Sequence, residues 1–185
     1  MNYKELSIRA HQNAVNHGFW ENMPSTNHFM MLVITEVAEM VEGDRKGKKA
    51  DRPNFEYQLS APITKHETAT EQERFAYWFE QYIKNTVEDE FADVAIRLLD
   101  LAGSRQIVPI INERQWQFAE SSFTENAFRL CEILSDGYSH SDVRIMLGIK
   151  YVERWAAHLG INLEWHIEQK MKYNESRPKK HGKNY

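Results

Sequence analysis

The fold is decided by the stretch Phe29-Met30-Met31-Leu32-Val33-Ile34-Thr35-Glu36-Val37-Ala38-Glu39-Met40-Val41, which is apolar on almost every side. Such a pattern predicts a helix buried in a core rather than one lying on a surface. Glu36 and Glu39 nevertheless lie inside it, and their spacing of three residues puts both carboxylates on one face of the helix. Like charges in apolar surroundings are costly unless a cation neutralises them, and hard divalent cations take oxygen ligands. The plainer alternative is an acidic strip that reaches water at a groove.

The composition is that of one globular domain. The chain has 185 residues, of which 42% are hydrophobic and 12% aromatic, enough for a substantial core. Its net charge of −4 gives no general attraction to nucleic acid, so we expect no nucleic-acid polymer as a partner. The single cysteine, Cys131, fits a reducing compartment. Neither a signal peptide nor an apolar run of about 18 residues is evident, so we expect a cytoplasmic protein that does not enter a membrane.

Apolar residues three and four positions apart predict the remaining helices. Most are bounded by a capping residue or a glycine, and they cover about 3–17, 25 to between 43 and 47, 70–83, 86–103, 123–135, 139 or 141 to 159, and 162–175. Residues 50–68 are expected to form a loop, because few apolar positions there are periodic. Only residues 107–111 resemble a strand, and Pro109 argues against one. The predicted fold class is all-α, a bundle of about six or seven helices.

A second acidic pair, Glu90 and Asp93, has the same spacing of three residues. With Arg97 and Asp100 it forms one polar stripe, and such a stripe is more often a solvated helix face. If the two acidic helices pack antiparallel, however, four carboxylates converge on a space the size of a metal ion. Mg²⁺ suits such a site and then holds the phosphates of a substrate.

Two further groups of residues suggest a nucleotide. Lys170, Asn174 and Arg177 recur at helical spacing, and lysine and arginine are natural phosphate ligands. The alternative for these three is a solvated C-terminal helix face. His11 and Trp20 flank the first turn, and a tryptophan can stack on a base. Taken alone, Trp20 is more often a core residue.

In combination these motifs resemble a known family. Thr35-Glu36-Val37-Ala38-Glu39 followed by Glu90-Phe91-Ala92-Asp93 resembles the EExxE…ExxD pattern of the MazG-like, all-α nucleoside triphosphate pyrophosphohydrolases. Lys170-Met171-Lys172-Tyr173-Asn174-Glu175-Ser176-Arg177 resembles the KMxxNxxR that closes many members. His11 and Trp20 stand at the same distances before Glu36 as the base-contacting histidine and tryptophan of the dCTP-pyrophosphatase branch. The likeness covers residues 10–42, 88–103 and 160–178.

The resemblance implies Mg²⁺-dependent hydrolysis of a (deoxy)nucleoside triphosphate to monophosphate and pyrophosphate, with Mn²⁺ as an alternative metal. It also implies that four carboxylates are the metal ligands and catalytic groups: Glu36, Glu39, Glu90 and Asp93. One of them, or an outer acid, would orient the attacking water. Lys170 and Arg177 would bind phosphate, and Asn174 would bind the nucleotide. Because members are usually oligomeric, a homodimer or homotetramer is expected.

The chain also departs from the family pattern. Thr35 replaces the first glutamate, and Arg97 stands where the dCTP branch has a tyrosine. We therefore expect one MazG-like domain over residues 1–178, with insertions at about 44–84 and 104–159, and a basic tail over 179–185. Thr35 and the insertions keep open a non-catalytic module for nucleotide sensing or protein binding. A purely structural helical protein with acids at its surface is the third alternative.

Overall fold

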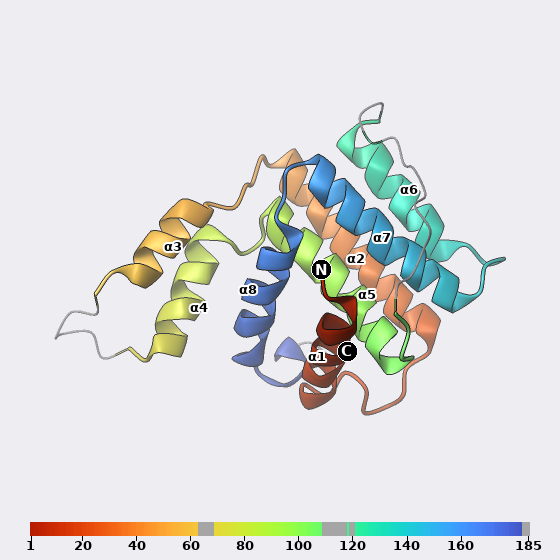
Figure 1. Ribbon diagram of the computed structural model, residues 1–185, viewed down its shortest axis with the longest axis horizontal. Coiled ribbons are helices and arrows are strands. Elements are labelled where there is room, and N and C mark those ends of the chain that lie inside the picture. The colour runs from red at the N-terminus through yellow and green to blue at the C-terminus, as the bar shows by residue number, and fades with distance from the viewer. Residues whose placement is uncertain (63–68, 109–117, 119–120, 183–185) are drawn as a thin grey trace.

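The structure, a computed structural model, describes residues 1–62, 69–108, 118 and 121–182, and in that part of the chain every regular element is helical (Figure 1). The all-α prediction is therefore confirmed. The helices are α1 (Tyr3–Asn16), α2 (Thr26–Arg45), α3 (Arg52–Ser60), α4 (Glu71–Tyr82), α5 (Val87–Ser104), α6 (Phe123–Ser135), α7 (Ser141–His158), α8 (Leu163–Glu175) and a short 3₁₀ turn, η1 (Lys179–Gly182).

The predicted caps begin these helices. The side chains of Ser25, Thr86 and Asn162 each accept a hydrogen bond from the backbone N–H three residues further on. Thr70 and Glu73 form the predicted capping box at the start of α4, each accepting from the other's backbone N–H. These local bonds satisfy N–H groups that a helix leaves without partners, so the helix starts follow from the sequence.

The predicted loop over 50–68 is wrong for its first half, which forms α3. Asp51 caps this helix, and Pro53 lies in its first turn, where a missing N–H group costs nothing. The helix buries one large apolar side chain, Phe55, so a periodic apolar pattern could not develop. Residues 63–68, the rest of that predicted loop, lie outside the described residues.

The helix α5 lies at the centre of the molecule, against α1, α2, α7 and α8 (Figure 1). Its apolar residues are buried on several sides, as Phe91 and Leu98 show, both with no exposed surface. The helices α2 and α5 run antiparallel, since Gly43 of α2 packs against the backbone of Val87 at the start of α5. This is the arrangement under which the two acidic pairs were expected to converge.

A second hydrophobic cluster lies apart from this core. It consists of five buried residues: Phe55 of α3, Phe75 and Phe79 of α4, Ile83 directly after α4, and Tyr173 of α8. Figure 1 shows α3 and α4 side by side at one end of the molecule, with α8 between them and the rest. The helix α8 therefore joins two separately packed bodies.

The remaining segments are short. Ile107 and Val108 form no regular structure, and residues 109–111, the rest of the strand-like segment, lie outside the described part. The basic tail is tied to the first turn, because Lys179 pairs with Glu21 at 2.5 Å. No helix among the described residues is both long and apolar enough to cross a lipid bilayer.

Candidate functional site

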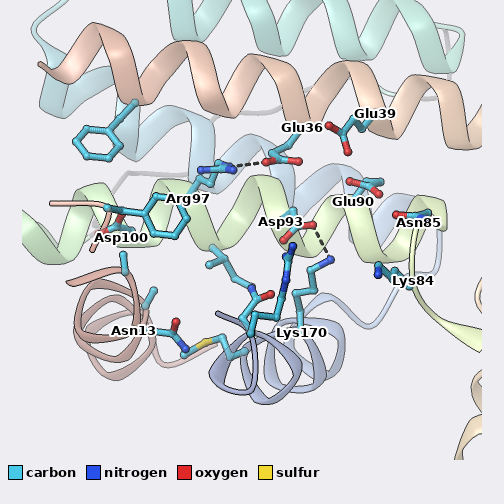
Figure 2. Close-up of a pocket in the computed structure, with 18 residues that line it drawn as sticks. Asn13, Glu36, Glu39, Lys84, Asn85, Glu90, Asp93, Arg97, Asp100 and Lys170 are labelled. Carbon is cyan, nitrogen blue, oxygen red and sulfur yellow. Dashed lines mark hydrogen bonds and ion pairs between the residues drawn. The ribbon is translucent and has the colours of Figure 1, made fainter. Parts of the chain in front are cut away.

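The described helices enclose a cavity of about 240 Å³ between α1, α2, α5 and α8 (Figure 2). The helix α5 supplies five of its lining residues: Glu90, Asp93, Ile96, Arg97 and Asp100. These positions recur every three or four residues, so they form one face of the helix. The polar stripe in the sequence is therefore the wall of a cavity and not a fully solvated surface.

Two overlapping groups of carboxylates lie at one end of this cavity. Glu36 and Glu39 of α2 and Glu90 of α5 each offer an oxygen atom within 4.8 Å of the others. Asp89, Glu90 and Asp93 form a second group that meets the same limit. The structure thus brings together the four acids singled out in the sequence. It adds Asp89, which belongs to neither of the two acidic pairs in the sequence.

Burial makes this cluster unusual. Glu90 is 3% exposed and Asp89 is 1% exposed, yet Oε2 of Glu90 and Oδ1 of Asp89 have no hydrogen-bond partner in the described part of the chain. Burial and the nearby charges of Asp93 and Asp89 raise the pKa of Glu90 to about 9. Burial also raises the pKa of Asp89 to about 6, although Lys170 opposes it. Two buried carboxyl oxygens without partners are suited to bind a cation or to hold a proton.

Two cations already touch the cluster. Nε of Arg97 donates to Oε1 of Glu36 at 2.6 Å (Figure 2). Nζ of Lys170 lies 2.8 Å from Oδ2 of Asp89 and 2.6 Å from Oδ2 of Asp93. Burial alone would lower the pKa of Lys170, but the carboxylates of Asp93 and Asp89 outweigh it and raise that pKa above its usual value.

The charges of the cluster do not balance. Five carboxylates (Glu36, Glu39, Asp89, Glu90 and Asp93) face two cations (Arg97 and Lys170), so full ionisation leaves a net charge of −3. The pKa of Glu36 is raised as well, because burial and the charge of Asp93 outweigh Arg97. A divalent cation would reduce this net negative charge. The cluster offers it carboxylate oxygens, which are the ligands that such hard cations prefer.

The three candidate phosphate and nucleotide ligands near the C-terminus differ in what they contact. All three, Lys170, Asn174 and Arg177, line the cavity. Lys170 contacts acids, whereas Asn174 is 6% exposed and its Oδ1 has no hydrogen-bond partner. The guanidinium of Arg177 lies 5.8 Å from the centre of the Tyr173 ring. Asn174 and Arg177 therefore offer an amide and a cation to the cavity, while Lys170 belongs to the acidic cluster.

Sequence reasoning missed a further cation at the acidic end. Lys84 lines the cavity, and its Nζ lies 3.0 Å from both Oε1 of Glu80 and the hydroxyl of Tyr173. Its neighbour Asn85 has a φ of 58°, a left-handed conformation that asparagine tolerates better than most residues. The backbone N–H of Asn85 donates to Oδ2 of Asp89 at 2.9 Å. The Asn-Thr pair before α5 was read in the sequence only as a helix cap.

His11 and Trp20 are not among the residues that line the cavity; they contact one that does. Nδ1 of His11 lies 2.8 Å from Oδ1 of Asp100, and Nε1 of Trp20 donates to the same oxygen at 2.9 Å. The Trp20 ring is also stacked on Phe29 with ring centres 4.3 Å apart. The sequence identified Asp100 only as part of the polar stripe. That His11 and Trp20 contact a base stays a prediction.

The arrangement offers oxygen ligands for a hard cation at one end of the cavity and cations and amides beside them. Comparison of the chain with known proteins adds no assignment to this geometry. No protein-family model, no curated protein and no solved structure matches the sequence or the fold.

Proposed function

We propose that this protein is a metal-dependent hydrolase that converts a (deoxy)nucleoside triphosphate to its monophosphate and pyrophosphate. The observation that carries the proposal is the buried acidic cluster, whose Glu90 has an unpartnered carboxyl oxygen beside a cavity also lined by Lys84, Asn174 and Arg177. Carboxylates, one of them with an unpartnered oxygen, and cationic side chains therefore line one cavity. A metal-bound polyphosphate could contact both kinds of group at once.

The cluster fits Mg²⁺, with Mn²⁺ as the alternative. The ligands we propose are the four acids first identified in the sequence: Glu36, Glu39, Glu90 and Asp93. Three of them keep an oxygen for a metal, because Glu36 and Asp93 each use one oxygen for a cation and Oε2 of Glu90 has no partner. Glu39 is exposed at the cavity wall. When bound, the divalent cation supplies a Lewis acid and a template for phosphate oxygens.

The chain's own residues then position the substrate. Arg177 and Lys84 take up phosphate charge, and Asn174 donates to or accepts from the sugar or phosphate. The cation of Lys170 offsets the repulsion between the carboxylates of Asp89 and Asp93 and orients both side chains through its ion pairs. Glu39, as the exposed acid of the cluster, accepts a hydrogen bond from the attacking water and directs it at the α-phosphorus. Positioning and charge stabilisation supply most of the rate in such phosphoryl chemistry.

Product analysis tests this proposal. The protein is incubated with Mg²⁺ and each of the standard and damaged nucleoside triphosphates, and the products are separated. We expect monophosphate and pyrophosphate, and we expect Glu36→Gln and Glu39→Gln to abolish turnover. Glu132→Gln is the matched control, because Glu132 is exposed on α6, away from the cavity. Diphosphate and orthophosphate as products, or parental rates in both site variants, would overturn the proposal.

A second candidate function is a non-catalytic nucleotide sensor that uses the same cavity. One observation favours it: the two cations Arg97 and Lys170 already form ion pairs with three of the carboxylates. This candidate predicts nucleotide binding by calorimetry with no product after hours of incubation. Turnover that depends on Mg²⁺ eliminates it.

A further inference from the structure

The cavity has a second polar group, far from the acidic cluster. Asp93 and Asp100 are seven residues apart on α5, so they lie on one face, separated by about 10 Å along the helix axis. Figure 2 shows Asp100 at one end of the cavity and Glu90 at the other. If the acidic end holds phosphates, Asp100 stands where the base of the nucleotide would lie.

The two oxygens of Asp100 are not equivalent. Oδ1 accepts from Trp20 Nε1, which can only donate, and contacts Nδ1 of His11. Among the described residues, Oδ2 has a single, longer hydrogen bond, 3.2 Å from the same indole nitrogen. Since each carboxylate oxygen accepts about two hydrogen bonds, Oδ2 keeps the spare capacity. His11 and Trp20 therefore fix the carboxylate and leave one acceptor for the cavity that Asp100 lines.

The surroundings of this acceptor suit an aromatic ring. Phe29, which is stacked on Trp20, lines the cavity, as does Phe19, the neighbour of Trp20 in the chain. Ala10 and Ala14 of α1 line it as well, and Asn13 of the same helix adds an amide. Aromatic and small apolar side chains beside a carboxylate suit a flat ring that carries an N–H donor.

We propose that Asp100 selects nucleotides whose base presents an exocyclic amino group, and that His11 and Trp20 are its positioning residues. The proposal rests on the proposed function for the orientation of the nucleotide, with phosphates at the acidic end. A base amino group donates to Oδ2, whereas a carbonyl oxygen at the same place meets a carboxylate that can only accept. The selected class is therefore amino-bearing bases over uracil, thymine and hypoxanthine.

The discriminating variant is Asp100→Asn. Its amide oxygen must take the place of Oδ1, because Trp20 can only donate to it. The amide NH₂ group then occupies the place of Oδ2, and the acceptor in the cavity becomes a donor. If Asp100 had only a structural role, the substitution would weaken the binding of all nucleotides by a similar factor. The proposed role removes or reverses the preference within matched pairs, in which an amino group and a ring acceptor nitrogen of one member correspond to a carbonyl group and a ring N–H of the other.

Calorimetry with dCMP and dUMP, and with dAMP and dIMP, gives the readout without any need for turnover. We expect the parental protein to bind the amino-bearing member at least about tenfold more tightly, and the ratio to fall at least about tenfold in Asp100→Asn, since a hydrogen bond to a charged group is worth that much. Glu132→Gln should keep the parental ratio. Trp20→Phe, which keeps the ring but removes the N–H, should lower the ratio without reversing it.

Either of two results would overturn the inference: equal binding of the paired nucleotides by the parental protein, or an unchanged ratio in a folded Asp100→Asn protein. The parental measurement decides the matter even if that variant does not fold. Failure of the proposed function is a separate result, because it is the lack of pyrophosphate release, whereas the base ratio is measured on monophosphates.

Discussion

Glu90 should make the metal-free protein less stable as the pH rises above neutrality. Its pKa is raised to about 9 in the folded protein from an ordinary value of 4.5. Between these values the folded protein holds a proton that the unfolded chain has lost, so the free energy of unfolding falls with increasing pH. One such proton is worth about 1.4 kcal/mol per pH unit. From about pH 7 to about pH 8.5 the loss approaches an upper limit of about 2 kcal/mol.

This pH window lies above the folded-state pKa values of Asp89 and His166, two other shifted groups. The pKa of Asp89 is raised only to about 6, and burial lowers the pKa of His166 to about 4. Both therefore finish titrating near or below neutrality, in the folded and the unfolded chain. For a protein of this length, a loss of about 2 kcal/mol lowers the melting temperature by about 4–8 °C.

The assay is thermal unfolding, followed by circular dichroism, in EDTA at both pH values. Glu90→Gln, which cannot ionise, should remove most of the decrease, and Glu132→Gln should leave it unchanged. Mg²⁺ should also remove it in the parental protein, because a bound cation favours the ionised carboxylate. A parental melting temperature that is constant across the window, or an equal decrease in Glu90→Gln, would refute this account of the cluster.

Three further changes test the packing and the caps. Lys170→Met should lower the free energy of unfolding in urea by about 3–5 kcal/mol, because it leaves the buried Asp89 and the partly buried Asp93 without their cation. Lys172→Met, on the exposed side of the same helix, should cost less than about 1 kcal/mol. Gly103→Ala should lower the melting temperature clearly, since the new methyl group would overlap the backbone of α1; Gly137→Ala, with open space around it, should have little effect. Thr70→Ala should cost about 1 kcal/mol in the same urea titration by removing the capping box of α4, and an unchanged midpoint would contradict that role.

Helix boundaries could be predicted because the signals are local. Thr70, Thr86 and Asn162 act within one turn of their own position, and long apolar stripes such as that of α5 need no knowledge of the partner helix. The helix α3 was missed because Phe55 alone carries its burial and its partners, Phe75 and Phe79, come from a later segment. A single buried side chain leaves no periodicity in the segment that carries it.

The same distinction between local signals and contacts between helices applies to the candidate site. The spacing within each acidic pair predicted which carboxylates share a face, and α2 and α5 bring the pairs together as expected. The partners of those acids could not be predicted, because Arg97 and Glu36 are 61 positions apart and Lys170 and Asp89 are 81 apart. His11 likewise had no visible link to Asp100. Residue types indicated the chemistry, but only the packing of helices showed which charge meets which.

The separate packing of α3 and α4 has a consequence for how the site can move. Their aromatic cluster shares no buried residue with the main core, so this hairpin can open as a cooperative unit of its own, at less cost than global unfolding. Lys84 belongs to the hairpin through Glu80 of α4, yet it lines the cavity. Each local opening would withdraw one cation from the cavity while the carboxylates on α2 and α5 stay in place. Amide hydrogen exchange in α3 and α4 would then report how often Lys84 leaves the cavity.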